Sequence, residues 1–265
     1  MTSGRDYVRE KMPILGFGTY QIRDESTLHG VVDAALSCGY RFFDTAQVYE
    51  NEAALGRIFK ELLPKYDLER EDIFITSKVS PANQGTDPAR KSIKKSLANL
   101  QTDYIDLMLI HWPGISKAAV SDKRNPVKRR QTYEVLEEYH ESGELRAIGV
   151  SNYEIRHLEE LLEHCKIHPA VNQAYSSLGS PDYRDELFND PEVQQLAAKY
   201  KITVPQFLLA WATSQSISVL PRTTNPERVA PNFEAKDVKI SSDDVQKLLD
   251  NGMCHKACWD PRVVV

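Results

Sequence analysis

The stretch Ile105–Trp112, IDLMLIHW, decides how the rest of this chain is read. Five of its first six residues are apolar, which is typical of a strand that is buried on both faces, as in a parallel sheet covered by helices. Segments with apolar residues spaced three and four apart precede it (87–100) and follow it (129–143). The chain around this strand therefore alternates between helix and strand.

The same alternation extends in both directions from this strand. Strands are predicted at 14–21, 41–46, 72–79, 105–112, 145–152, 170–176 and 217–222, and helices at 26–39, 51–66, 87–100, 129–143, 154–166, 191–201, 204–215, 226–233 and 241–251. Strands that alternate with helices imply parallel pairing and right-handed crossovers. We therefore expect an α/β fold of the (β/α)8 TIM-barrel type, although only seven barrel strands can be recognised.

Length and composition favour one domain, residues 1–265. A chain of 265 residues suits a barrel of repeated strand–helix units, and no linker interrupts it. A net charge of −5 argues against nucleic acid and anionic membranes as partners. No apolar run is long enough for a transmembrane helix, and the start MTSGRDYVREKM lacks the apolar segment of a secretory signal. Four scattered cysteines suit a reducing compartment, so we expect a cytoplasmic protein. We also expect a monomer that acts on a small molecule.

Ionisable side chains end three consecutive strands. Asp44 ends the second strand and is followed by Tyr49, Lys78 ends the third, and His111 ends the fourth. Barrel active sites lie at the C-terminal ends of the strands. Any one of these side chains alone would more often be part of a structural ion pair or a barrel wall. Their matching positions together favour a catalytic group.

The segments that carry these residues resemble the aldo-keto reductase family: GYRFFDTAQVYENE (39–52), FITSK (74–78), DYIDLMLIHWP (103–113) and AIGVSN (147–152). The likeness extends from about Ile14 to Asn251. It implies reduction of aldehydes or ketones to alcohols by hydride transfer, that is, an alcohol:NADP+ oxidoreductase.

The resemblance implies a role for each polar group. Tyr49 would protonate the carbonyl oxygen, and Lys78 would lower the high pKa of that tyrosine by favouring the phenolate. Asp44 would hold Lys78 charged and in place. His111 would orient the carbonyl by a hydrogen bond, and Trp112 would form an apolar wall for the substrate.

The resemblance also implies NADPH as the hydride donor, because no amino-acid side chain can supply a hydride. The positions that match the family's cofactor site near the nicotinamide and pyrophosphate are Gly18, Thr19, Asp44, Ser151, Asn152, Gln173, Tyr175, Ser176, Leu178 and Ser180. Of these, Tyr175 would stack on the nicotinamide ring.

The stretch LPRTTNPERVAPNF (220–233) resembles the family's site for the adenosine 2′-phosphate. Arg222 and Thr223 match phosphate-binding positions, and Arg228 and Asn232 match the adenine side. Arginine can bind phosphate through two hydrogen bonds, which favours NADPH over NADH. Pro231 stands where the family often has an acidic residue, which removes one adenine contact.

The stretch AVNQAYSSLGS (170–180) departs from the family pattern. It joins the beginning of a sixth strand directly to the end of a seventh, between Gln173 and Ala174, so that about one strand–helix unit is missing. A parallel crossover needs roughly a dozen residues or more, so this stretch can form only one strand. Gln173 and Tyr175 stay on one face because they are two positions apart.

Two closures of the barrel follow from this junction. The chain forms either a tighter seven-stranded barrel or an open one with unpaired strand edges, which invite aggregation. The enzyme hypothesis accordingly has two rivals. One is a non-catalytic structural or nucleotide-binding protein that keeps the fold, and the other is an impaired, splice-type product.

A cysteine–histidine cluster and a basic segment both have ordinary structural interpretations. Cys254, His255 and Cys258 lack an apparent fourth ligand, so we expect free thiols and no metal. The segment 117–130 carries six basic residues and one acidic one, typical of a solvated loop. The alternative is that this loop, which borders the substrate pocket in the family, attracts an acidic substrate.

Overall fold

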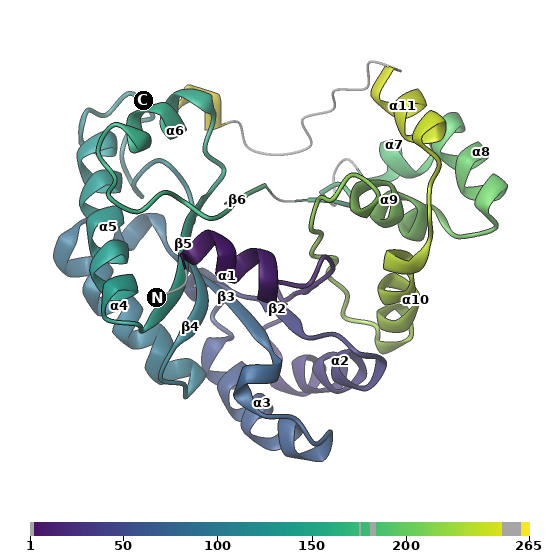
Figure 1. The fold of residues 1–265 in the computed structure, drawn as a ribbon, viewed down its shortest axis with the longest axis horizontal. Helices are drawn as coiled ribbons and strands as arrows, with labels where there is room; N and C mark the ends of the chain where they lie inside the picture. Colours follow the sequence, from purple (N-terminus) through teal and green to yellow (C-terminus); the bar gives the residue numbers. More distant parts are fainter. Residues whose placement is uncertain (1–2, 175, 181–183, 251–260) are drawn as a thin grey trace.

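Helices cover one face of a curled parallel sheet in the computed structural model, which describes residues 3–174, 176–180, 184–250 and 261–265 (Figure 1). Its strands follow chain order: β1 (Phe17–Gly18), β2 (Phe42–Asp44), β3 (Phe74–Val79), β4 (Ile105–Ile110), β5 (Leu145–Ser151) and β6 (Asn172–Gln173). Every pair is parallel, as the alternation with helices predicts. The sheet is a curled half-barrel.

The strand residues alternate between two apolar layers. Phe43, Ile75, Met108 and Ile148 point outward and pack beneath the helices. Their neighbours in the chain pack in a second cluster on the concave side: Phe42, Phe74, Leu107, Leu109 and Ala147. Because side chains alternate along a strand, the concave positions continue to the polar residues at the strand ends.

The seventh predicted strand joins the other edge of the sheet through a single bridge. Val219 pairs in parallel with Leu15, and the amides of Gly16 and Gly18 donate to Val219 and Pro221. Among the described residues, no strand pairs with the far edge of β6 or with that of the Val219 segment. Of the two closures that the sequence leaves open, the structure has the open one.

The helices are α1 (Gly4–Lys11), α2 (Glu25–Cys38), α3 (Glu52–Lys65), α4 (Thr86–Leu100), α5 (Arg124–Glu141), α6 (Ile155–Leu162), α7 (Arg184–Phe188), α8 (Pro191–Tyr200), α9 (Val204–Thr213), α10 (Val229–Glu234) and α11 (Ser242–Asp250). Helix α2 begins at an Asp24 cap and ends at Gly39, whose φ of 103° is the left-handed conformation that glycine adopts readily. Within the described ranges, every helix is too short or too polar to span a bilayer.

A separate apolar cluster holds α8, α9 and α11 together. Val193, Leu196, Phe207 and Ile240 are among its buried members. Figure 1 shows these helices on the side of the molecule opposite α4, α5 and α6, joined to β6 by the chain that follows it. Leu178, on that connection, packs against both this cluster and the main core.

Helix α1, which was not predicted, packs against the sheet near β5. Val8 belongs to the concave-side cluster, and Gly4 lies against Ala147. The Tyr7 hydroxyl donates to the buried Asp106 at 2.6 Å, and Arg70 pairs with the same carboxylate at 2.6 Å. These contacts place α1 at the start of strand β4, at the end of the barrel opposite the polar strand ends.

Candidate active site

The concave ends of β2 and β3 bring together Asp44, Lys78 and Tyr49. The Lys78 Nζ atom donates to both carboxylate oxygens of Asp44, at 2.6 and 2.7 Å. The same ammonium contacts the Tyr49 hydroxyl at 3.3 Å and donates to the Thr45 carbonyl at 3.0 Å. Tyr49 reaches this position from the short 3-10 helix Gln47–Tyr49, one turn beyond β2.

This ion pair is enclosed by protein. Lys78 is 1% exposed, Asp44 is 5% exposed and Tyr49 is 8% exposed. Burial alone would lower the pKa of the Lys78 ammonium, but Asp44 and the Tyr49 hydroxyl outweigh it and the pKa rises above its ordinary value. Lys78 is therefore a permanent cation beside the tyrosine hydroxyl.

His111 follows β4 and faces the same group. Its ring lies edge-on to the Tyr49 ring, with 5.7 Å between the centroids. Burial, helped by the Lys78 charge, lowers the pKa of His111 to about 3. The imidazole is therefore neutral near pH 7, and its buried Nδ1 atom has no hydrogen-bond partner among the described residues.

Two opposing effects act on the pKa of Tyr49. Burial raises it above its ordinary value of 10, and this effect outweighs the lowering by Lys78. Lys78 therefore acts on the tyrosine pKa in the predicted direction, but it does not overcome the effect of burial. Tyr49 carries its proton throughout the physiological range, as a proton donor must.

Two residues that the sequence did not single out shape the rim. The exposed Tyr20 packs on Tyr49, with 5.0 Å between ring centroids. The Gln84 amide donates to the carbonyls of Trp112 (2.7 Å) and Gly114 (2.9 Å), which fixes the backbone at the predicted substrate wall. Gln84 lies in a loop without a periodic pattern, so no sequence signal could have found it.

Ser151, Asn152 and Gln173 meet beside the ion pair. Ser151 donates to the Gln173 carbonyl at 2.8 Å, and Asn152 donates to the Ser151 hydroxyl at 2.9 Å and to the His111 carbonyl at 3.1 Å. The Gln173 amide reaches across to Asp44, at 2.9 Å. The structure thus links the predicted nicotinamide-binding residues directly to the predicted catalytic group.

Glycine 149 lets β6 approach β5 closely enough for this arrangement. A Cβ atom at Gly149 would lie 2.4 Å from the Val171 carbonyl oxygen, closer than real contacts allow. Ser151 and Gln173 pair in register immediately beyond this contact.

The remaining residues of the predicted nicotinamide and pyrophosphate site are spread along two chain segments. Gly18 and Thr19 adjoin β2, where the buried Thr19 hydroxyl donates to the Asp44 carbonyl at 2.9 Å. Leu178 packs into the core, and the buried Ser180 hydroxyl has no partner among the described residues. Ser176 adopts a φ of 67° in the turn that contains Gly179. Tyr175 lies outside the described residues.

The predicted 2′-phosphate residues lie on the segment that follows the Val219 bridge. The exposed Arg222 guanidinium donates to the carbonyls of Tyr20 (2.9 Å) and Gln21 (3.3 Å). Buried Thr223 bonds within its own turn, and the exposed Arg228 ends the 3-10 helix Pro226–Arg228. Asn232 is 8% exposed, so only its edge is available to a ligand.

The basic segment 117–130 is largely a structural element. It enters α5 at Arg124, five residues before the predicted start of that helix. Arg124 pairs with Asp122, Arg130 pairs with Glu134, and Arg129 is buried against Glu160. Ion pairs therefore neutralise half of the basic residues.

The described part of the chain has no metal site, because no three His, Cys, Asp or Glu side chains gather around one point there. Cys254, His255 and Cys258 lie outside the described residues. Cys38 and Cys165 are free thiols.

Comparisons with known proteins agree with this geometry. The model of the Aldo/keto reductase family matches residues 14–189 and 179–250. The chain belongs to the aldo-keto reductase family. It is 33% identical to the glyoxal reductase of Bacillus subtilis, over 90% of this chain and 88% of that protein. It is 30% identical to aldo-keto reductase family 1 member A1 of Gallus gallus, over 92% of this chain and 88% of that one.

Solved structures of aldo-keto reductases share the fold. An aldo-keto reductase from a Medee basin deep-sea metagenome library superposes with a TM-score of 0.83 at 31% identity, covering 94% of each chain. The aldose reductase of Schistosoma japonicum gives a TM-score of 0.82 at 28% identity, covering 93% of this chain and 90% of that one. The chain therefore has the barrel-type fold of this family of oxidoreductases.

Proposed function

We propose that this protein reduces aldehydes or ketones to alcohols with NADPH, and that Tyr49 is the general acid. The observation that carries the proposal is the buried Lys78 ammonium, which contacts the Tyr49 hydroxyl at 3.3 Å while paired with Asp44. An enclosed cation beside a protonated phenol is suited to stabilise the negative charge that remains when the proton leaves.

Four residues divide the chemistry at the carbonyl, and a fifth bounds the substrate. Tyr49 transfers its proton to the carbonyl oxygen as the hydride reaches the carbon, and the Lys78 charge stabilises the resulting phenolate. Asp44 keeps Lys78 charged and directed at the hydroxyl. Neutral His111, with an unpartnered buried nitrogen, offers a hydrogen-bonding imidazole for the carbonyl. Trp112 bounds the substrate.

Bound NADPH would supply the hydride. The residues beside Asp44 fit its nicotinamide. The side-chain amide nitrogens of Asn152 and Gln173 donate to protein oxygens. Their side-chain oxygens can therefore accept hydrogen bonds from a carboxamide NH2. The buried Ser180 hydroxyl, which has no partner among the residues that the structure describes, suits a phosphate oxygen on the segment matched to the pyrophosphate. Arg222 and Arg228 provide exposed guanidinium groups for the 2′-phosphate.

Two of the similar proteins support an aldehyde as substrate. They are the glyoxal reductase of Bacillus subtilis and the aldose reductase of Schistosoma japonicum, whose names both refer to carbonyl compounds. We also propose a cytoplasmic location, which the scattered cysteines of the sequence suit, and a monomeric state.

NADPH titration followed by turnover tests the proposal. Tryptophan and tyrosine fluorescence should change on adding NADPH, and absorbance of the reduced cofactor should fall once an aldehyde is supplied. Arg222→Ala should weaken NADPH binding by about tenfold or more, because a charge-assisted pair to the 2′-phosphate is lost, while NADH binding stays unchanged. Arg57→Ala, which removes an exposed arginine from α3, is the matched control.

The outcomes separate the rival functions. NADPH binding without turnover across a panel of aldehydes and ketones would favour a nucleotide-binding protein. Absence of both binding and a cooperative melting transition would favour the impaired product.

A further inference from the structure

Residues 47–52, here called the tyrosine segment, carry Tyr49 between β2 and α3. The segment begins with the 3-10 helix Gln47–Tyr49, in which the Tyr49 amide donates to the Ala46 carbonyl at 2.9 Å. Glu50 then has a φ of 60°, a left-handed conformation that is unfavourable for a residue with a side chain and needs support from its surroundings. One helical turn has little stability of its own. Contacts from outside the segment must therefore fix the position of Tyr49.

Gln47 ties the beginning of the tyrosine segment to two neighbouring elements. Its side-chain nitrogen donates to the Ser92 carbonyl at 2.7 Å. Its side-chain oxygen accepts from the Ser92 hydroxyl at 2.6 Å and from the side-chain amide of Asn83 at 2.7 Å. Ser92 lies on α4, and Asn83 ends the 3-10 helix Pro81–Asn83 that follows β3. Both polar atoms of the Gln47 amide thus bind other elements.

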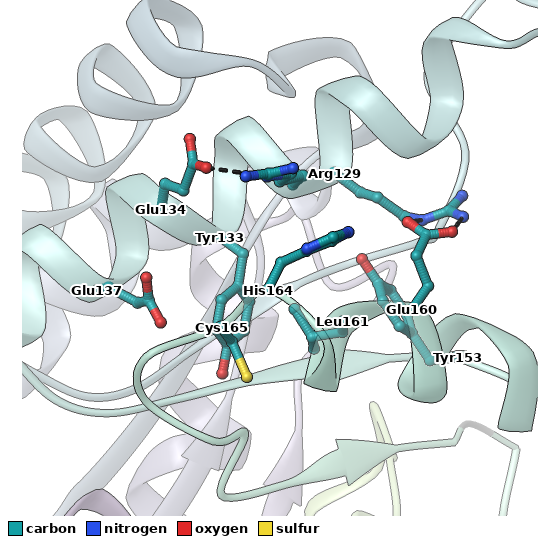
Figure 2. A pocket seen from close by; sticks show the side chains of 10 residues that line it. Arg129, Tyr133, Glu134, Glu137, Tyr153, Glu160, Leu161, His164 and Cys165 are labelled. Carbon is teal, nitrogen blue, oxygen red and sulfur yellow. Dashed lines mark hydrogen bonds and ion pairs between the residues drawn. The ribbon is translucent and has the colours of Figure 1, made fainter.

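Glu52 ties the other end of the tyrosine segment, where α3 begins, to β3 and α4. It is only 2% exposed, and its carboxyl oxygens accept from the Ser77 hydroxyl at 2.7 Å and from the Asn99 side-chain amide at 3.2 Å. At the pocket between α5 and α6, by contrast, Glu160 is paired with Arg129 (Figure 2). Among the described residues, Glu52 has no such cationic partner. A buried carboxyl group that is held by neutral donors costs stability, which points to a positioning role.

The partners at both ends of the tyrosine segment belong to the same part of the barrel. Ser92 and Asn99 are seven residues apart on α4, which is about two helical turns, so they lie on one face of that helix. Ser77 comes directly before Lys78 on β3, and Asn83 ends the turn that follows this strand. The tyrosine segment is therefore held against the strand that supplies its ammonium partner.

We propose that Gln47 and Glu52 are positioning residues, which hold the tyrosine segment so that the Tyr49 hydroxyl stays within reach of Lys78. The catalytic part of this proposal rests on the proposed reductase function. The two side chains act through the backbone of the segment, because their hydrogen bonds go to α4, β3 and the turn after β3. The contact that they maintain is the one of 3.3 Å between the hydroxyl and the ammonium. Proton transfer needs hydrogen-bond reach, so a small displacement of the segment slows it.

Glu52→Gln, compared with Glu50→Gln, tests whether the tyrosine segment is held in this way. Both variants exchange one carboxyl oxygen for an NH2 group within the same segment. At Glu52 the NH2 group faces donors from Ser77 and Asn99, so one hydrogen bond is lost. Glu50 is exposed and pairs with Arg23 at the surface, which makes it the matched control.

Hydrogen–deuterium exchange at the Tyr49 amide measures the result. It should speed up by about fivefold to tenfold in Glu52→Gln, because local opening becomes easier. It should match the wild type in Glu50→Gln. Gln47→Met, which keeps the length of the side chain and removes its amide, should speed up exchange to the same extent. Because Gln47 is only half-buried, this variant decides the question if Glu52→Gln fails to fold.

Single-turnover reduction of an aldehyde tests the effect on catalysis. The rate constant should fall about tenfold in Glu52→Gln and in Gln47→Met, as expected for a misplaced reacting group. KM for the aldehyde and the affinity for NADPH should stay within about twofold, because the interaction that is lost acts on the transition state. The solvent deuterium isotope effect on the rate should increase, because transfer of the Tyr49 proton becomes slower. Glu50→Gln should behave like the wild type.

Each outcome decides a separate claim. Unchanged exchange at the Tyr49 amide in both Glu52→Gln and Gln47→Met would overturn the proposal, whether or not the protein turns over. Faster exchange with an unchanged rate and isotope effect would overturn the catalytic part alone. A loss of rate matched by an equal loss of NADPH affinity would show general damage to the site and would also overturn that part. Absence of turnover in the wild type would refute the reductase function and the catalytic part with it, and the exchange data would still decide how the segment is held.

Discussion

At the scale of single residues, the site depends on opposite electrostatic effects on neighbouring groups. Burial lowers the pKa of His111 to about 3 and raises that of Tyr49 above 10, while Lys78 remains charged because of Asp44. A neutral imidazole, a protonated phenol and an ammonium therefore coexist over a wide range of pH. This combination suits donation of a proton to a carbonyl.

The pH profile of reduction should be flat through neutrality. His111 is neutral above its pKa of about 3, so it does not titrate between pH 5 and pH 8. Tyr49 must be protonated to act, and its pKa is raised, so activity should fall only as the pH climbs above 10. We expect kcat/KM for an aldehyde to show no inflection from pH 5 to pH 9. An inflection near the ordinary histidine pKa that vanishes in His111→Asn would contradict this assignment.

At the scale of elements, regular periodicity could be predicted and isolated contacts could not. The repeated apolar spacing of α2 and α4 identifies these helices from sequence because each buries one apolar stripe in the main core. The helix predicted at 51–66 is confirmed as α3 (Glu52–Lys65), and it continues through Pro64 because a proline in the last turn removes only one terminal hydrogen bond.

Caps and short elements were predicted less well. The helix predicted at 87–100 begins one residue earlier, at Thr86, and its N-terminal cap is Gly85. Helix α1 was not predicted, although Ser3 and Asp6 have the spacing of an N-terminal cap. The buried role of Arg129 could not be foreseen, because it depends on Glu160 and Val265, which are distant in the chain.

Two helical glycines make a matched test of the packing between elements. A Cβ atom on Gly30, in α2, would meet nothing within 4 Å, whereas one on Gly56, in α3, would lie 2.3 Å from the Asn99 carbonyl oxygen of α4. Gly30→Ala should raise the free energy of unfolding by up to about 1 kcal/mol through helix propensity. Gly56→Ala should lower it by about 1–3 kcal/mol through overpacking.

Urea unfolding of the two alanine variants measures both changes. Equal stabilisation by the two substitutions would show that α3 and α4 are not in close contact at Gly56. Destabilisation by Gly30→Ala would show that α2 is packed on the face that the structure leaves free.

At the scale of the whole molecule, the candidate site draws its residues both from the middle of the open barrel and from its edge, and the Gln173 amide joins the two at Asp44. The four predicted catalytic residues come from the middle strands β2 to β4 and the loops that follow them: Asp44, Tyr49, Lys78 and His111. Gln173 stands on β6, which ends the sheet in the described residues (Figure 1). The sequence predicts an altered junction after Gln173 but could not choose between closure and opening, since that choice depends on strand tilt and packing across the whole barrel.

Deuteride transfer in the full chain tests most directly whether this barrel catalyses the proposed reaction. NADPH deuterated at C4 of the nicotinamide should give an alcohol that carries deuterium on the former carbonyl carbon, detected by mass spectrometry. Tyr49→Phe should reduce the rate of transfer by about 100-fold or more, as expected for loss of a general acid. Tyr20→Phe, which changes the exposed ring that packs on Tyr49, should stay close to wild type. Labelled alcohol formed equally fast by Tyr49→Phe and wild type would contradict the account.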